Sequence, residues 1–143
     1  MLESKATETV VGPRALVVED ERDMNTLITY HLEKNGIHTI GAMDGEIGLL
    51  LAMRNHFDVV ILDLMLPSMS GLEVCRQIRA RCRPLPPVII ITAVSTEVVR
   101  SLGDKLQAVE VLHKPFKPAE LVQLVRNLLH LTGENPRPAG EAA

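Results

Sequence analysis

From Arg14 to Leu131, short continuous apolar runs alternate with longer stretches in which apolar residues recur every three or four positions. Short runs of β-branched and aliphatic residues are typical of strands buried on both faces, as in parallel sheets. Bounded by turn residues, these runs predict five strands, at residues 15–19, 37–41, 59–62, 88–92 and 109–112.

The stretches that follow the strands predict five helices. In the first, the residues that follow the 3.6-residue period are Met24, Leu27, Ile28, His31 and Leu32. Gly36 is placed to end this helix, as glycine often does. The remaining helices are expected at about residues 45–55, 72–82 and 96–102, and from Pro118 onward. Ser95 is the expected N-cap of the fourth, and proline is favoured in a first helical turn.

A strand–helix unit repeated five times predicts an α/β fold, a doubly wound parallel sheet with right-handed crossovers and helices on both faces. A chain of 143 residues suits one such domain, which we place at residues 14–131. The flanking residues lack periodicity. We expect residues 1–13 to form a flexible N-terminal segment, and residues 132–143 to form a disordered tail or the start of a linker.

The composition narrows the class of protein. Apolar residues make up 46% of the chain and aromatic residues only 2%, so the core must be aliphatic. The net charge of −3 gives no electrostatic reason for direct nucleic-acid binding, which favours a basic face. No apolar stretch approaches a membrane span, and Met1–Thr9 has no apolar signal core. We expect a soluble, cytoplasmic protein whose domain contacts neither nucleic acid nor membrane.

Cys75 and Cys82 are the two cysteines of the chain. They fall seven residues apart in a predicted helix, so their separation along the axis is about 10 Å. That is too far for a disulfide, and the sequence has no Cys/His spacing typical of a metal site. We predict two free thiols.

Acidic residues stand where two predicted strands end. Asp63 follows the run Val59–Leu62, and the cluster Glu19–Glu21 follows the run Ala15–Val18. The carboxyl ends of parallel strands open onto the ligand crevice, so a shared acidic pocket is expected there. Carboxylates so close repel each other, and a bound divalent cation relieves the repulsion. Taken alone, the acidic cluster also suits the N-terminus of a helix.

Two further side chains should reach the same edge of the sheet. Thr92 ends the fourth predicted strand, and Lys114 follows the fifth. Lysine supplies a compact positive charge suited to a phosphoryl group, and carboxylate oxygens suit Mg²⁺. The set therefore indicates a metal and anion site around one nucleophilic carboxylate, Asp63, of the kind that forms an aspartyl phosphate.

Five stretches in this order resemble the receiver domain of two-component response regulators: Leu16–Glu21, Asp63–Pro67, Met69–Gly71, Ile91–Ala93 and Lys114–Phe116. The resemblance covers about residues 14–131. It implies a flavodoxin-like five-stranded sheet with strand order 2-1-3-4-5. It also implies a signalling switch rather than an enzyme.

By this resemblance, Asp63 accepts a phosphoryl group from a sensor histidine kinase or a histidine phosphotransfer protein. Thr92 is the switch hydroxyl, and Lys114 pairs first with the carboxylate and then with the phosphoryl oxygens. The Lys114–Pro115 bond is expected to be cis. The face formed by the fourth helix, fifth strand and fifth helix should readjust and control a downstream protein or a fused output domain. A phosphorylation-linked homodimer through that face is a further expectation.

The resemblance also implies the metal ligands. Asp20, Asp63 and the main-chain carbonyl of Met65 would bind Mg²⁺ directly, and Glu19 would act partly through water. Whether the chain is a stand-alone receiver or part of a longer regulator stays open at this point, as do the cognate kinase and the output.

Three positions depart from the family pattern. Val111 stands three residues before Lys114, where the family usually has an aromatic residue, so a tyrosine rotamer cannot carry the output signal here. Met65 and Val94, two residues after Asp63 and Thr92, have no side-chain group that could orient an attacking water. We therefore hypothesise slow self-hydrolysis of the phosphoryl group.

Two other functions use similar residues. A phosphatase of the haloacid-dehalogenase type also has a strand-end aspartate nucleophile, but it needs a second aspartate where this chain has Met65. A receiver-like scaffold without phosphotransfer would not need the acidic pair, Thr92 and Lys114 together.

Overall fold

The computed structural model describes residues 12–106, 108 and 110–131. Its strands are β1 (Arg14–Val18), β2 (His38–Ala42), β3 (Val59–Asp63), β4 (Val88–Thr92) and β5 (Glu110–His113). Its helices are α1 (Arg22–Lys34), α2 (Gly45–Arg54), α3 (Gly71–Arg81), α4 (Thr96–Leu102) and α5 (Pro118–Leu131), with a 3-10 turn, η2 (Gly103–Lys105), after α4.

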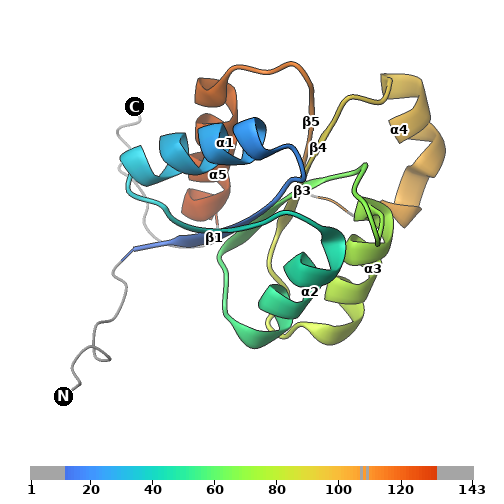
Figure 1. Cartoon of the computed structure of the whole chain (residues 1–143), viewed down its shortest axis with the longest axis horizontal. Coiled ribbons are helices and arrows are strands. Elements are labelled where there is room, and N and C mark those ends of the chain that lie inside the picture. Colours follow the sequence, from blue (N-terminus) through green and yellow to red (C-terminus); the bar gives the residue numbers. More distant parts are fainter. Residues whose placement is uncertain (1–11, 107, 109, 132–143) are drawn as a thin grey trace.

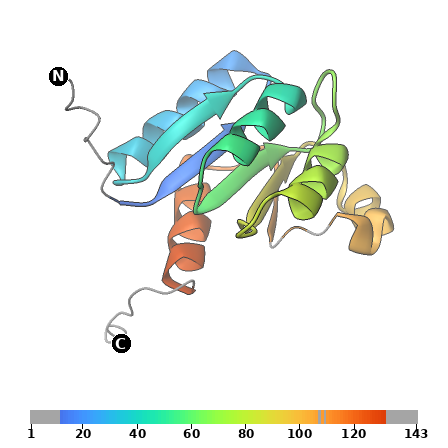
Figure 2. The ribbon, with the colours of Figure 1, turned by 90° about the horizontal axis from the view of Figure 1, so that it is seen from below.

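The strands form one parallel sheet in the order β2-β1-β3-β4-β5. Helices α1 and α5 cover one face, and α2 and α3 cover the other (Figure 1). Seen from below, the sheet separates the two helical layers (Figure 2). The predicted α/β fold, its strand order and its five helices are confirmed.

Successive side chains of the central strands point to opposite faces of the sheet and so form two separate cores. In β3, Val60 and Leu62 face the layer of α2 and α3, while Val59 and Ile61 face α1 and α5. Every residue of β3 and β4 is buried, as expected for central strands covered on both faces. The cores are almost entirely aliphatic. Each fully buried Leu or Ile contributes about 1.5–3 kcal/mol relative to exposure.

Helix α1 ends in a Schellman motif. Gly36 has a φ of 84°, its N–H donates to the Glu33 carbonyl, and the Ile37 N–H donates to the Leu32 carbonyl. Because that bond uses the Ile37 N–H, sheet pairing begins at His38, one residue later than predicted. The helix-ending role of Gly36 is confirmed. The buried face of α1 differs from the predicted stripe at one position, since Leu27 is 41% exposed.

The other element bounds lie within one residue of prediction wherever the structure describes them. Helix α4 and β4 match, and the Ser95 hydroxyl accepts a hydrogen bond from the Val98 N–H at 3.2 Å. Strand β3 extends through Asp63 rather than stopping at Leu62. The predicted start of the fifth strand, Val109, lies outside the described residues, as do residues 1–11 and 132–143 of the predicted flanking segments.

Cys75 and Cys82 are free and buried, as predicted. Burial raises the pKa of both thiols. The Lys114–Pro115 peptide is cis, as expected, and Arg83–Pro84 is a second cis peptide that was not predicted. Within the described residues, none of the helices combines the length and the apolar character that crossing a bilayer requires.

Candidate functional site

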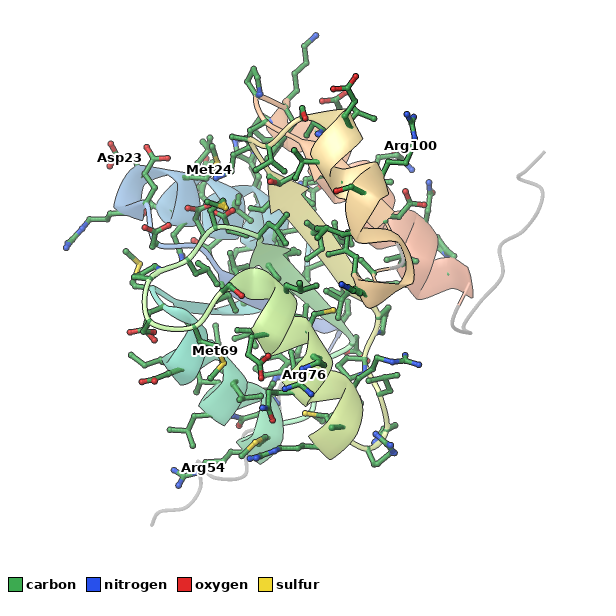
Figure 3. The ribbon with its side chains drawn as sticks, turned by 90° about the vertical axis from the view of Figure 1, so that its right-hand side faces the viewer. Asp23, Met24, Arg54, Met69, Arg76 and Arg100 are labelled. Atoms are coloured by element: carbon green, nitrogen blue, oxygen red, sulfur yellow. The ribbon has the colours of Figure 1, made fainter. Side chains whose placement is uncertain are left out.

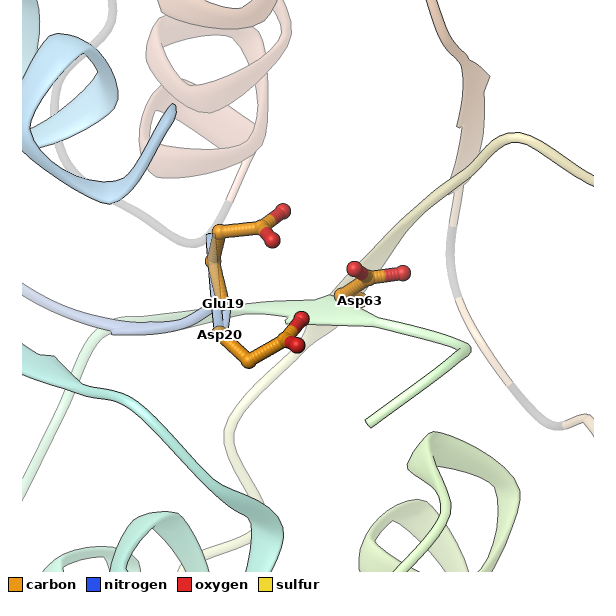
Figure 4. A group of neighbouring side chains, drawn as sticks. All are labelled: Glu19, Asp20 and Asp63. Atoms are coloured by element: carbon orange, nitrogen blue, oxygen red, sulfur yellow. The ribbon is translucent and has the colours of Figure 1, made fainter. Parts of the chain in front are cut away.

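Three carboxylates meet at the carboxyl edge of the sheet. Asp63 is the last residue of β3, and Glu19 and Asp20 follow β1 directly. Because β1 and β3 are paired with Val18 beside Leu62, the three residues are brought side by side. One oxygen from each carboxylate lies within 4.8 Å of the others. Figure 4 shows the three side chains around a common space. The predicted acidic pocket is thus present in the geometry.

Lys114 reaches this pocket from beyond β5. Its Nζ lies 2.9 Å from Glu19 Oε1 and 3.1 Å from Asp63 Oδ2, and its side chain is 17% exposed. The Lys114 N–H donates to the Thr92 carbonyl at 2.7 Å, which fixes the turn from which the side chain projects. One ammonium therefore faces three carboxylates, so the pocket keeps an excess of negative charge.

Burial, hydrogen bonds and neighbouring charges shift the pKa values of Glu19 and Lys114. Burial raises the pKa of the Glu19 carboxyl, with Asp63 adding to the rise, against the lowering effects of the Lys114 bond and the Glu21 N–H. Burial lowers the pKa of Lys114, but its hydrogen bonds to Glu19 and Asp63 and their charges outweigh burial, and the net shift is upward. Lys114 therefore stays an ammonium. A single lysine does not offset the crowded carboxylates, and a cation would.

The donor set fits a hard divalent cation. All three side chains offer carboxylate oxygens, which Mg²⁺ prefers, and they come from two adjacent strand ends. Met65, the fourth predicted ligand, contacts the site through its N–H, which donates to Asp63 Oδ1 at 3.0 Å. The ligand role of the Met65 carbonyl stays a prediction.

Thr92 lies at the same edge, at the end of β4, and is fully buried. Its Oγ1 accepts a hydrogen bond from the Val94 N–H at 3.1 Å. The Val94 carbonyl in turn lies 3.2 Å from His113 Nδ1, at the end of β5. Thr92 thus lies at the same edge of the sheet as the acidic pocket, and Val94 connects its side chain to His113 of β5.

Two of the positions that depart from the family pattern, Val111 and Met65, occupy different surroundings. Val111 is half-buried in β5, paired with Ile90, and packs on the core that α2 and α3 cover. This is the ordinary place of a β-branched strand residue. Met65 is 63% exposed, at the mouth of the pocket.

Sequence reasoning missed Asn25. It is buried on α1, and its amide donates to the carbonyls of Glu19 at 3.0 Å and Ala42 at 3.1 Å. These bonds join the ends of β1 and β2 and so hold Glu19 in place. The sequence feature that could have revealed this role is the position of Asn25, a polar residue on the same helix face as the apolar Ile28 and Leu32. A polar side chain on a buried face needs hydrogen-bond partners.

Gly71 is a second residue whose role was missed. Its N–H donates to the Leu64 carbonyl at 2.9 Å, and a Cβ at this position would collide with the Asp63 carbonyl oxygen and lie 2.6 Å from Leu64 Cα. Only glycine lets the start of α3 lie this close to the end of β3. The loop that carries Met65 therefore begins and ends beside Asp63.

The chain belongs to the family of response regulator receiver domains, whose family model matches residues 15–126. This is the family that the sequence motifs resemble, and the chain is thus a receiver domain of the two-component type.

PhoP of Bacillus subtilis strain 168, an alkaline phosphatase synthesis transcriptional regulatory protein, is 39% identical over 119 residues, which are 83% of this chain and 49% of PhoP. The chain spans about half the length of the curated relatives that it matches.

Two solved structures show the same fold. The receiver domain of the Francisella response regulator 1452 is 32% identical with a TM-score of 0.78, and the match covers 85% of this chain and all of that domain. The receiver domain of the Pseudomonas aeruginosa sensor histidine kinase PA1611, with magnesium in its active-site cleft, is 30% identical with a TM-score of 0.75. That match covers 83% of this chain and 98% of the domain.

Proposed function

We propose that Asp63 is the phosphoacceptor of this receiver and takes a phosphoryl group from a sensor histidine kinase or a histidine phosphotransfer protein. The observation that carries the proposal is the position of the Asp63 carboxylate, 3.1 Å from the Lys114 ammonium and beside Glu19 and Asp20. A carboxylate at the end of a buried strand, with a cation beside it, is positioned for nucleophilic attack on phosphorus.

In the transfer, an Asp63 oxygen forms a bond to phosphorus as the bond from phosphorus to the donor imidazole nitrogen breaks. The imidazole keeps the electron pair of that bond. Charge accumulates on the phosphoryl oxygens during such a transfer, so the process needs nearby positive charge. The Lys114 ammonium supplies it, because it lies within hydrogen-bond reach of Asp63 and its raised pKa keeps it protonated.

Glu19, Asp20, Asp63 and the Met65 carbonyl are the groups that would hold Mg²⁺, with Glu19 acting partly through water. Bound there, the cation would neutralise charge on the phosphoryl oxygens. The magnesium in the cleft of the PA1611 receiver supports this assignment. So does the excess negative charge of the three carboxylates around one lysine.

Phosphorylation would act through Thr92. It adds about 1.5 to 2 negative charges and three acceptor oxygens at Asp63. The Thr92 oxygen accepts from Val94, and its hydroxyl proton can be donated to a phosphoryl oxygen. Because Val94 connects Thr92 to His113 on β5, movement of Thr92 would pass to the face of α4, β5 and α5. A complete population shift would need about 5.5 kcal/mol of differential stabilisation.

The unit at residues 14–131 would serve as a cytoplasmic regulatory module rather than an enzyme. PhoP, about twice as long as the matched region, is a transcriptional regulatory protein. We therefore propose that the output is a fused domain or a separate protein controlled through the α4, β5 and α5 face, including a phosphorylation-linked homodimer. Direct binding to nucleic acid or membrane is not part of the role proposed for this unit.

The experiment that tests this function exposes the purified protein to acetyl phosphate and Mg²⁺ and follows its intact mass. One phosphoryl group per chain should be gained, and alkali or hydroxylamine should remove it, as expected of an acyl phosphate. Asp63→Asn should abolish the gain, and Asp23→Asn, an exposed first-turn carboxylate on α1, should not change it. Removing Mg²⁺ with a chelator should suppress it. Repeated turnover of a phosphomonoester would instead favour a phosphatase, and no modification would favour a scaffold.

A further inference from the structure

Helix α2 carries three of its large apolar side chains on its solvent side. Its buried residues are mostly small: Gly45, Gly48, Leu49 and Ala52. A Cβ at Gly48 would lie 2.8 Å from the side chain of Val18, so this face of the helix lies close against the sheet. The side chains it exposes are Ile47, Leu50 and Met53, at 48%, 42% and 42%.

These three exposed residues form one stripe. They are spaced three apart, so they lie on the same side of the helix. Isolated exposed apolar side chains are normal on a soluble protein, but a continuous apolar stripe marks an interaction surface. In α2 the stripe has Leu50 at its centre, with Ile47 one turn before it and Met53 one turn after it.

On α2, one charged residue lies toward each end of the stripe. At the Met53 end, Arg81 of α3 also approaches, with its Nη1 3.9 Å from Met53 Sδ. Glu46 lies four residues before Leu50 and Arg54 four residues after it, and both are exposed. Figure 3 shows Arg54 at the outer end of α2. Eight residues of helix separate the two charges by about 12 Å, too far to pair within one helix. Both side chains lie on the same half of the helix surface as Leu50.

We infer that this face of α2 is a contact between two copies of the chain, packed antiparallel about a twofold axis beside Leu50. In such a contact the same patch serves both partners. Leu50 then meets Leu50, and Ile47 meets Met53. Each Glu46 lies level with the Arg54 of the second copy. The centred stripe and the opposite charges at equal distances from its centre are what self-pairing requires.

This contact would be separate from the switch. Helix α2 packs beside α3, and the proposed output face is built from α4, β5 and α5 (Figure 1). The pairing therefore does not need a phosphoryl group on Asp63, and it does not depend on the phosphoacceptor role. Because the patch is small, the dimer should be weak, with a dissociation constant on the order of 100 µM.

Sedimentation velocity of the full chain across a concentration series tests the contact. The wild type should move from monomer to dimer as its concentration rises. Leu50→Glu places two carboxylates at the axis and should weaken the dimer at least about 30-fold. The matched control is Leu27→Glu, an apolar residue of α1 with 41% exposure, which should dimerise like the wild type. Asp63→Asn should also dimerise normally.

A charge exchange tests the register and direction of the pairing. Glu46→Arg or Arg54→Glu alone would set like charges against each other at two places and weaken the dimer about tenfold. The double variant should restore it. Mixing the two single variants should also restore association, because each charge then faces its opposite in the heterodimer. Circular dichroism checks that every variant keeps its fold.

Restored association in the double variant and in the mixture would establish antiparallel α2 pairing. A wild type that stays monomeric up to about 1 mM would overturn it. So would a Leu50→Glu protein that dimerises as well as the wild type, or a double variant that stays as weak as the single ones. A dimer that forms only after phosphorylation would overturn it too, because it would belong to the switch face.

Discussion

At the scale of single residues, the central feature is the charge balance around Asp63. Lys114 bonds to both Glu19 and Asp63, and Asp20 adds a third carboxylate within 4.8 Å. Removing the lysine leaves buried carboxylates without a counter-charge, which is costly, whereas removing one carboxylate relieves repulsion. The two kinds of substitution should therefore change stability in opposite directions.

Lys114→Met should lower the free energy of unfolding by about 2–4 kcal/mol in the absence of Mg²⁺. Added Mg²⁺ should recover part of that loss, because a cation bound to the native state stabilises it. Asp63→Asn should be neutral or stabilising by up to about 1 kcal/mol. Urea unfolding measures the loss in Lys114→Met, its recovery by Mg²⁺ and the effect of Asp63→Asn. A larger loss for Asp63→Asn than for Lys114→Met would show that the crowded carboxylates do not repel as described.

The side chains beside the site should set the lifetime of the phosphoryl group. Met65 is 63% exposed at the pocket and cannot orient a water molecule for attack. We predict slow hydrolysis of phosphorylated Asp63 in Mg²⁺, with a half-life of minutes or longer. Met65→Asn should shorten it several-fold, and the isosteric Met65→Leu should not. Phosphate release from purified phosphoprotein measures both. A wild-type half-life of seconds would disprove the prediction.

At the scale of elements, the junction between β3 and α3 positions Asp63, the proposed phosphoacceptor. Gly71 begins α3 against the backbone of Asp63 and Leu64, with no space for a Cβ. Gly71→Ala should cost about 1–3 kcal/mol through overpacking and should also slow phosphorylation by acetyl phosphate, because Asp63 must shift.

Gly36→Ala is the matched control. A Cβ at position 36 would have open space, but the backbone there has a φ of 84°. The substitution should therefore cost about 1–2 kcal/mol of backbone strain. Its phosphorylation rate should equal that of the wild type, because the end of α1 lies away from the site. Equal phosphorylation rates in both variants would show that Gly71 does not position Asp63.

Element boundaries could be predicted where local chemistry decides them. Ser95 and Gly36 mark helix ends in the sequence because their capping bonds are local. The start of β2 was misplaced by one residue, because the Ile37 N–H is taken by the carbonyl of Leu32 and not by the sheet. The exposure of Leu27 also depends on tertiary packing, which periodicity alone does not reveal.

At the scale of the whole molecule, the parallel sheet and the meeting of Glu19, Asp20, Asp63 and Lys114 could be predicted from the residues, and the strand order from the family resemblance. Short apolar runs and strand-end polar residues reveal a parallel sheet and its ligand edge. The residues that hold the site in place, Asn25 and Gly71, could not be predicted. Asn25 and Gly71 act through contacts with backbone that lies far away in sequence or folds back on itself. Such contacts leave little trace in a pattern of apolar positions.

The most direct test of the central claim is to locate the phosphoryl group. The protein is treated with acetyl phosphate and Mg²⁺, the acyl phosphate is reduced with borohydride, and the peptides are sequenced by mass spectrometry. The account predicts homoserine at position 63 and unmodified aspartate at positions 20 and 58. Homoserine at another position, or none with a wild-type protein shown to be folded, would contradict it.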